Sequence, residues 1–228
     1  MAITTAMPGT FKAELFAGAH CFGGPVTVVG STHSNDTIDG IVSMAGISIG
    51  MTIVETNGDC VAGTIVTDIV SATTIRIYPN AIGTHSATSL VFTGDVFKVA
   101  LIRHSPTGTY GGATVNYSDV TGATDEVTGT GYTAGGLPLT NVAPTLTGTI
   151  AFVSFGGTVS WTTATIDSDG CIIYNTNNRL GGMSGTNTTG TNRAVYLGDF
   201  AGRQLVSAGT FTIVMPTADA THAILRLQ

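Results

Sequence analysis

Apolar residues follow a helical period in only one part of the chain, near its start. Phe11, Leu15, Ala19 and Phe22 are separated by four, four and three positions, which places them on one face of a helix. Pro8 precedes this run and two glycines follow it, as is common at the two ends of a helix. The pattern predicts one short helix that covers the end of a β core. The alternative is an arm that docks on a partner.

Between Gly30 and Thr93 the apolar positions form short β-like runs that glycines interrupt. The piece is about 65 residues long, which is enough for a small sandwich or barrel of its own. The expected strands are Asp36–Val42, Met51–Glu55, Val61–Ile69, Thr74–Tyr78, a weak one near Ala81, and Ser89–Thr93. We therefore predict an inserted outer β domain at residues 25–94.

Longer and better separated strands follow this segment. Val96–Arg103 is apolar enough to be covered on both faces of a sheet. In Thr210–Met215, alternation places Phe211, Ile213 and Met215 on one face. The expected strands are Val96–Arg103, Leu137–Thr140, Gly148–Phe155, Val159–Thr162, Cys171–Asn175, Ala194–Phe200, Thr210–Met215 and His222–Leu227. About eight strands over about 130 residues predict an all-β protein with an antiparallel β-sandwich or jelly-roll-like base, formed by residues 1–24 and 95–228.

Two stretches lack a strand pattern, His104–Glu126 and Asn175–Asn192. The second is a low-complexity polar segment that cannot build a core by itself. Long loops in a compact domain are usually functional or become ordered against a neighbour, so we expect partner contacts there. The candidate docking residues are Phe11, Leu15 and Phe16 of the helix and Tyr110, Tyr117, Arg179 and Met183 of the two loops.

The chain carries few charges. Charged residues make up 10% of it, and 8 Lys and Arg against 14 Asp and Glu give a net charge of −6. The cations are scattered singly, whereas a protein that grips phosphates needs them clustered, so direct nucleic-acid binding is not expected. Threonine and 31 glycines take the places of the missing charges. Large uncharged surfaces tend to lie against another molecule, which favours assembly.

The cysteines and the hydropathy indicate where the protein is made. Cys21, Cys60 and Cys171 are far apart and odd in number, so we expect buried free thiols rather than disulfides or a zinc site. The start lacks the pattern of a secretory signal, and no window approaches the ~18 apolar residues of a membrane span. We expect synthesis in a reducing cytosol and no membrane contact.

No pattern of residues points to catalysis or to a metal. Gly182–Thr186 resembles a nucleophile elbow, but its second glycine is misplaced for G-x-S-x-G. Asp167–Gly170 has the first carboxylates of a calcium loop without the later ligands, and its composition favours a hairpin turn. The five histidines are isolated, and the acidic pair Asp125-Glu126 has no partner suggested by spacing. We expect no catalytic residue, no metal and no cofactor, and thus no enzyme.

Several segments together resemble a family of small virion proteins of tailed bacteriophages. They are Phe11–Leu15, Phe97–Leu101, Glu126–Gly136, Ile173–Asn175, Asn192–Val195 with Asp199-Phe200, Thr210–Ile213 and Pro216–Ile224. The Glu126–Gly136 run and the C-terminal strand pair are the most specific parts. The resemblance covers the helix and the C-terminal β domain and implies a phage structural protein, with head decoration or cement as the expected role and no enzymatic activity.

The chain departs from the short members of that family at residues 25–94, because in those members the helix leads almost directly to the F-K-V-A-L strand. The added piece resembles a β module that is common in phage and bacterial surface proteins. We expect a decoration protein on the capsid exterior that contacts the major capsid protein and clusters as a homo-oligomer, with trimers favoured. The alternatives are a tail or adaptor component, or a part that binds host glycans through Tyr110, Tyr117 and Tyr132.

Overall fold

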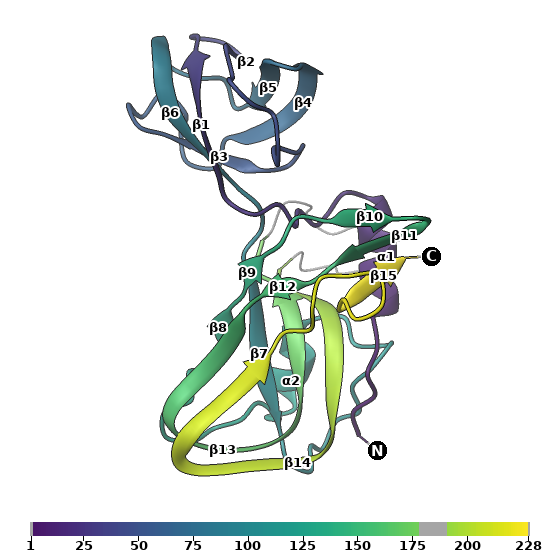
Figure 1. The fold of residues 1–228 in the computed structure, drawn as a ribbon. Coiled ribbons are helices and arrows are strands. Elements are labelled where there is room, and N and C mark those ends of the chain that lie inside the picture. The colour runs from purple at the N-terminus through teal and green to yellow at the C-terminus, as the bar shows by residue number, and fades with distance from the viewer. Residues whose placement is uncertain (1, 178–190, 228) are drawn as a thin grey trace. The chain divides into compact units, whose positions relative to one another are not determined.

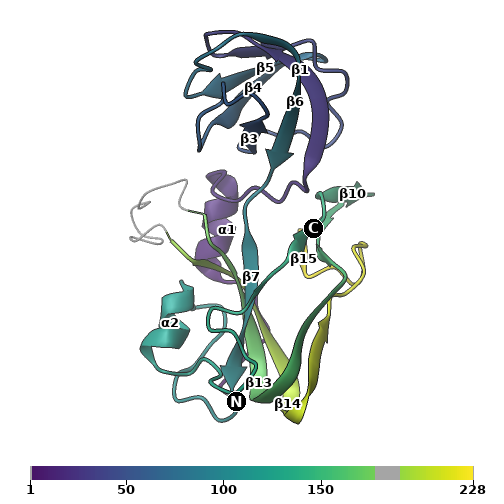
Figure 2. The same cartoon turned by 90° about the vertical axis from the view of Figure 1, so that its left-hand side faces the viewer.

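A computed structural model describes residues 2–177 and 191–227 of the chain (Figures 1 and 2). Strands hold 48% of the residues and helices 7%, and the sheets are antiparallel, which confirms the all-β class. The chain divides into two compact units. The base unit takes residues 1–20, 96–140 and 144–228, and the barrel unit takes residues 21–95 and 141–143.

The barrel unit is a closed barrel in which each strand pairs antiparallel with its neighbours. The strands are β1 (Val26–Thr32), β2 (Thr37–Asp39), β3 (Thr52–Glu55), β4 (Ile65–Ser71), β5 (Thr74–Tyr78) and β6 (His85–Thr93). They follow one another around the barrel in the order β1, β2, β5, β4, β3, β6, and β6 pairs again with β1. Alternate side chains such as Ile38, Ile75 and Leu90 fill the interior, and closure leaves the barrel without a free sheet edge.

The sequence pattern did not predict β1, because Gly30 interrupts its apolar run. In the structure a Cβ atom on Gly30 would lie 2.7 Å from Leu90 Cδ1 and 3.2 Å from Ile41 Cγ1. The missing side chain therefore leaves room for these two core residues inside the barrel.

The chain enters and leaves the barrel at one place. The Cys21 N–H donates to Asp95 Oδ2 at 2.9 Å, and the Gly94 N–H donates to the Gly23 carbonyl at 3.1 Å. The Asn141 side chain donates to the carbonyls of Gly23 and Asp95. The two ends of the barrel unit are thus held side by side.

The base unit is built from three antiparallel sheets. Its elements are α1 (Gly9–Phe16), β7 (Phe97–Arg103), α2 (Tyr117–Gly122), β8 (Leu137–Pro138), β9 (Thr140–Asn141), β10 (Thr145–Thr147), β11 (Ile150–Val153), β12 (Phe155–Gly156), β13 (Thr158–Asn175), β14 (Arg193–Val214) and β15 (Leu225–Leu227). The largest sheet has the order β14-β13-β7-β8, and the others are β10-β11-β15 and β12-β9.

Strand β7 lies in the interior of the base. Its residues from Val99 to Ile102 have no exposed surface, as the apolar run predicts for a strand covered on both faces. One face packs on Tyr110 and on Val120 of α2, and the N-terminal residue Ile3 belongs to the same cluster. The N-terminal segment and α2 therefore close this side of the core.

Strands β13 and β14 form one long hairpin, side by side in Figure 1. The sequence pattern predicted two strands in place of each. For β13 the reason is the polar segment Asp167–Gly170, which we expected to be a turn and which lies within the strand. Asp167 pairs with Arg203 on β14, and Asp169 accepts hydrogen bonds from His104 and Ser105. With those partners the carboxylates stay within the strand, and a register shift between Ser168 and Gly170 takes up the bend.

The helices also differ from the prediction. Helix α1 ends at Phe16, before Ala19 and Phe22, because Gly18 adopts a positive φ of 68° just after it. Helix α2 lies in the loop that showed no pattern, and its Asp119 carboxylate accepts the N–H groups of Val115 and Asn116 at its start. Within the described ranges, neither helix is long and apolar enough to cross a membrane.

Candidate docking surface

The structure places several candidate docking residues in the core of the base. Phe11 has no exposed surface, and its ring centroid lies 4.8 Å from that of His20. Tyr110 is 3% exposed. Tyr117 stacks on Tyr174 with centroids 4.4 Å apart. Phe11 and Tyr110 thus pack the base and offer no surface to a partner, and one face of the Tyr117 ring is already covered.

Two of the helix candidates remain at the surface. Phe16 is 94% exposed at the end of α1, and Leu15 is half-buried beside it. The loop candidates Arg179 and Met183 lie outside the described residues. Phe16 is therefore the most accessible aromatic candidate of the set.

Tyr110 can be buried because Asp125 accepts a hydrogen bond from its hydroxyl. Its carboxylate accepts hydrogen bonds from the Tyr110 hydroxyl at 2.6 Å, from the N–H groups of Thr107 and Gly108, and from Arg103 Nε at 2.9 Å. Burial opposes ionisation, but these donors outweigh it and hold the pKa of Asp125 well below its usual range. Burial, and then the bond to Asp125, raise the pKa of Tyr110. This carboxylate holds the loop after β7 in place.

Glu126 gathers the next tyrosines in the same way. Its carboxylate accepts the hydroxyls of Tyr117 and Tyr132 and the N–H of Gly135. The Tyr174 hydroxyl donates to the Gly135 carbonyl at 2.6 Å. Burial raises the pKa of Tyr174 to about 12. The Glu126–Gly136 run therefore packs the base. Sequence spacing missed both carboxylates because their partners follow no helical or strand period in the surrounding loop.

A third polar cluster ties α1 to the start of β14. The Nε2 atom of His20 lies 2.9 Å from the Glu14 carboxylate, and Arg193 Nε lies 3.5 Å from the same carboxylate, with all three side chains buried. Asn175 Oδ1 accepts the Asn177 N–H, so the Asn175 amide nitrogen faces His20 Nδ1 at 2.9 Å. This arrangement fits a His20 ring that carries its proton on Nε2. The cluster is a structural tie within the base.

The barrel unit has its own buried carboxylates. Asp59 accepts the Thr32 hydroxyl at 2.5 Å and lies 2.7 Å from His85 Nδ1. These two contacts lower the pKa of Asp59, and the bond to Asp59 raises the pKa of His85. Glu55 accepts from Thr88 and from the Asp59 N–H. Since Thr32 donates to the carboxylate and not to His85, the histidine activates no hydroxyl in this arrangement.

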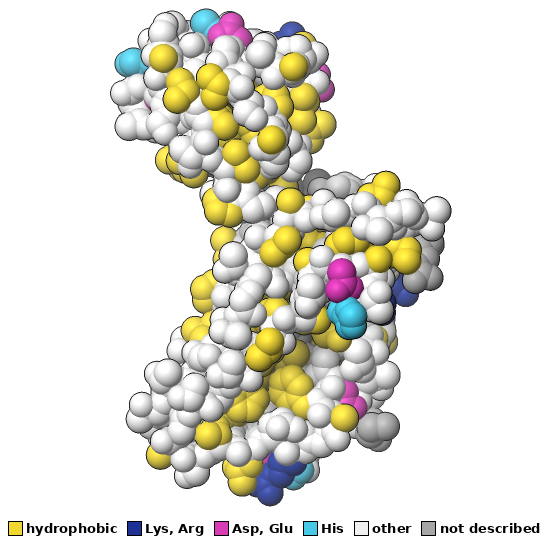
Figure 3. All heavy atoms as spheres, viewed as in Figure 1, with side chains coloured by type: hydrophobic (Ala, Val, Ile, Leu, Met, Phe, Trp, Pro, Cys, Tyr) yellow, Lys and Arg dark blue, Asp and Glu magenta, His cyan; other side chains and the backbone are white. Residues whose placement is uncertain are grey.

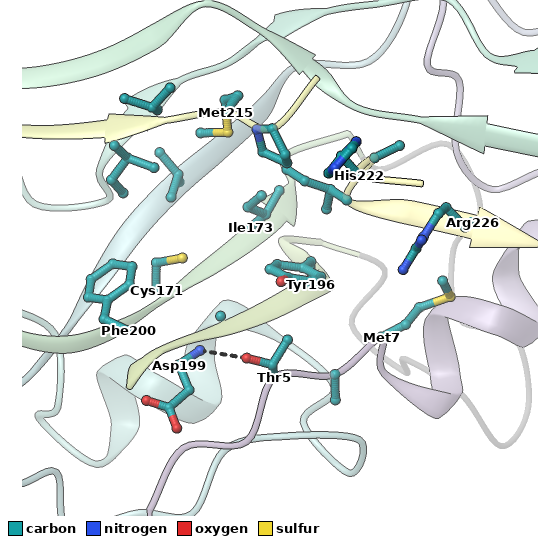
Figure 4. Close-up of a pocket in the computed structure, with 18 residues that line it drawn as sticks. Thr5, Met7, Cys171, Ile173, Tyr196, Asp199, Phe200, Met215, His222 and Arg226 are labelled. Atoms are coloured by element: carbon teal, nitrogen blue, oxygen red, sulfur yellow. Dashed lines mark hydrogen bonds between the residues drawn. The ribbon is translucent and has the colours of Figure 1, made fainter. Parts of the chain in front are cut away.

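The base carries an apolar hollow on the face of its sheet opposite α2. It has a volume of about 460 Å³ and is lined by residues of β13 and β14, by the N-terminal segment Thr5–Met7, by the chain from Met215 to Arg226, and by Val99 of β7. Figure 4 shows Cys171, Ile173 and Met215 around it, with Tyr196 nearby, and Figure 3 shows hydrophobic side chains in a depression on this part of the surface.

A second hollow of about 560 Å³ continues the first along β14. The two share Phe200, Ile213 and Val214, and Leu205 and Phe211 line the second. Both are open to solvent at the outer side of β14. Together they form a shallow surface of mixed apolar and polar character next to a strand.

That strand is the last one of its sheet, and much of its outer edge is open. The first part is covered, because Leu197 exchanges two backbone hydrogen bonds with Ala6 and the Asp199 N–H donates to Thr5 Oγ1. From Arg203 to Val214 no described residue pairs with the outer edge. Soluble proteins usually protect such edges with charges, prolines or covering segments.

The open part of β14 has almost no charge. Arg203 is its single charged residue, and Asp167 holds both ends of the guanidinium at 2.7 Å. Leu205 is 61% exposed and Val214 is 71% exposed. The segment therefore offers free backbone groups and apolar side chains with no net repulsion, which is the chemistry that strand-to-strand contacts use.

The ionisable side chains that line the first hollow have partners: Asp199 accepts the Ala201 N–H, His222 contacts Asp219, and Arg226 donates to the Thr221 carbonyl. Burial raises the pKa of Cys171 to about 12 and also raises the pKa of Tyr196, so neither side chain is a ready nucleophile. Among the residues the structure describes, no three His, Cys, Asp or Glu side chains gather as a metal site would need. All three cysteines are free and buried, as predicted. This surface can bind by contact area and backbone hydrogen bonds.

No known protein family, curated protein or solved structure matches the chain.

Proposed function

We propose that the chain is a structural protein of a tailed-bacteriophage virion and that it works as a head decoration, or cement, protein on the capsid exterior. Its partner is the major capsid protein, and it performs no catalysis. The observation that carries the proposal is the nearly uncharged surface of the base, where two hollows can lie against shell subunits and the open edge of β14 can join neighbouring copies. The resemblance of the Glu126–Gly136 run to phage virion proteins supports the choice of a virion as the assembly in which this surface makes its contacts.

The physical argument starts from what a cement protein must do. It has to link neighbouring shell subunits through many weak contacts, because packaged DNA strains the shell from inside. Threonine-rich strands suit this task, since their methyl groups bury apolar area and their hydroxyls form hydrogen bonds with little loss of side-chain entropy. On β13 and β14, Ser160 and Thr212 display such hydroxyls 2.9 Å apart at the exposed face of the hairpin.

The tyrosines that would bind a glycan are held within the base. Sugar rings stack on exposed aromatic faces, but Tyr110 is bonded to Asp125, and Tyr117 and Tyr132 are bonded to Glu126. The accessible aromatic side chains are elsewhere, with Phe16 94% and Tyr78 69% exposed on different units. A tail or adaptor role uses the same kind of contact surface and differs from the head role in its place on the virion.

Particles that lack the protein separate these roles. A phage that encodes the chain is grown with the gene deleted, and DNA release on heating is followed for deleted and normal particles. A cement protein predicts release at a lower temperature from the deleted particles and recovery when the purified full chain is added, with buffer alone as the control. Deleted particles with normal heat resistance and failed host adsorption would contradict the head role and favour the tail role.

A further inference from the structure

The backbone direction along the end of β14 follows from one hydrogen bond. The Met215 N–H donates to the Gly157 carbonyl, and β13 and β14 remain in register from there to Trp161 and Phe211. Backbone groups alternate in direction along a strand, so the residues with odd numbers from 211 to 215 face β13. Thr210, Thr212 and Val214 therefore point their N–H and C=O groups toward the open edge.

We infer that this edge pairs antiparallel with the same edge of a second copy of the chain, about a two-fold axis at Thr212. In this register Thr212 lies opposite Thr212 of the copy, and Thr210 lies opposite Val214. All three residues with outward backbone groups then exchange both hydrogen bonds with their opposite residue. A two-fold axis centred on Phe211 or Ile213 would not pair all of Thr210, Thr212 and Val214. At least one of them would lie opposite a position outside this segment and lose its backbone partner.

The side chains agree with this register. Phe211 of one copy lies across from Ile213 of the other, on the face where both are half-buried and line the hollow. Aromatic and β-branched side chains are favourable cross-strand pairs. The other face brings together the exposed side chains of Thr210, Thr212 and Val214. A strand that meets itself must avoid like charges, and residues 204–214 carry none.

The size of the contact sets its strength. Five paired residues span about 17 Å of strand. A contact between two single strands of that length buries far less area than the ~1,200 Å² at which stable interfaces begin. The pair is therefore weak in dilute solution and gains strength where copies are held close together. A contact of a patch with itself joins two copies and cannot close a ring of three, so in a trimeric array it would link one cluster to the next. The inference depends on β14 alone and not on the proposed function, so the purified chain tests it.

The first test compares two lysine variants of the full chain by sedimentation equilibrium up to millimolar protein. Thr212→Lys places two like charges opposite each other at the axis and should raise the dimer dissociation constant about tenfold or more. Ser160→Lys is the matched control, since it loses the same side-chain hydrogen bond and projects from the same face of the neighbouring strand. It should leave the constant within about twofold. Equal effects of the two variants would overturn the inference, as would a wild-type chain that remains monomeric.

The second test does not depend on how well a lysine is tolerated. Thr212→Cys and Ser160→Cys are treated with a short bismaleimide, and the native cysteines are buried. Across the proposed axis the Cα atoms of residue 212 lie about 5.5 Å apart, whereas those of residue 160 are separated by three strand spacings, about 14 Å. Dimers should form much faster with Thr212→Cys. Equal rates, or a faster reaction of Ser160→Cys, would refute pairing of two copies at this edge. That result is also the one expected if the edge of β14 binds a different protein.

Discussion

The Tyr110 hydroxyl donates a 2.6 Å hydrogen bond to Oδ2 of Asp125, and the Asp125 side chain has no exposed surface. The two residues are fifteen positions apart, in a stretch without any periodic pattern. The next residue, Glu126, holds Tyr117 and Tyr132. A pair of adjacent carboxylates that looked isolated in the sequence is thus the centre of the polar core in this part of the base.

Removal of the Tyr110 hydroxyl should destabilise the base. Tyr110→Phe leaves Asp125 with its remaining donors and without one charge-assisted bond, so we expect a loss of about 1.5–3 kcal/mol in the free energy of unfolding. Urea unfolding followed by the fluorescence of Trp161, the single tryptophan and a buried residue of the base, measures it. Tyr78→Phe, at a 69% exposed tyrosine of the barrel, is the control and should leave the transition in place. Equal stabilities of Tyr110→Phe and the wild type would contradict the role of the pair.

Gly136 should tolerate no side chain. It has a φ of +68°, and a Cβ atom there would overlap the Val99 carbonyl and the backbone of β7. We expect Gly136→Ala to cost about 3 kcal/mol or more, because backbone would have to move. Gly148→Ala is the matched control: its φ is +60° but its Cβ would meet open space, so only the conformational cost of about 1 kcal/mol applies. Similar losses in the two variants would show that the close approach to β7 is not what requires the glycine.

The Asp59–His85 contact should give the barrel a stability optimum in mildly acidic solution. The raised pKa of His85 stabilises the fold below its unfolded value of about 6.5, and this contribution is lost as the pH rises through the folded value. The lowered pKa of Asp59 stabilises the fold above its unfolded value of about 3.9, and this contribution is lost as the pH falls through the folded value.

The advantage of wild type over His85→Gln should therefore be largest between these two values and shrink above neutral pH. Hydrogen exchange of peptides from β1 and β6 reports the opening of the barrel. His222→Gln, a substitution in the base, is the control and should not change their exchange. A constant difference between His85→Gln and wild type at every pH would count against the ion pair.

Deletion of the barrel should leave a folded base. The Gly94 N–H bonds to the Gly23 carbonyl, so residues 25–94 leave and return at neighbouring points of the chain and a short glycine linker can span the gap. We expect a single cooperative transition in Trp161 fluorescence for the deleted chain, with a midpoint close to that of the base in the full chain. A broad, non-cooperative loss of signal would show that the base needs the barrel.

The sequence pattern predicted the parts of the fold that depend on neighbouring residues. Strand β5 lies where the alternation in Thr74–Tyr78 put it, and the unbroken apolar run predicted the buried strand β7. The pattern missed β1 because a glycine such as Gly30 usually interrupts a strand. In the structure Gly30 is needed because a side chain there would collide with Leu90 across the barrel. A contact between distant strands leaves no local signal.

The same reason accounts for the candidate site. Asp167–Gly170 has the composition of a turn, but pairing with β7 and β14 and the contacts of Asp167 with Arg203 and of Asp169 with His104 keep it extended. The tyrosines of the loop looked available to a partner because Asp125 and Glu126 had no visible function. The open edge of β14 was hidden as well, because which strand ends a sheet depends on the order of pairing.

The number of copies in the virion tests the central claim most directly. Purified particles are digested, and peptides of this chain are quantified against those of the major capsid protein with labelled standards. If the chain is a cement protein that covers the shell, the ratio of its copies to those of the major capsid protein should approach one. A handful of copies per particle would contradict the head role, whatever the strength of the contacts at β14.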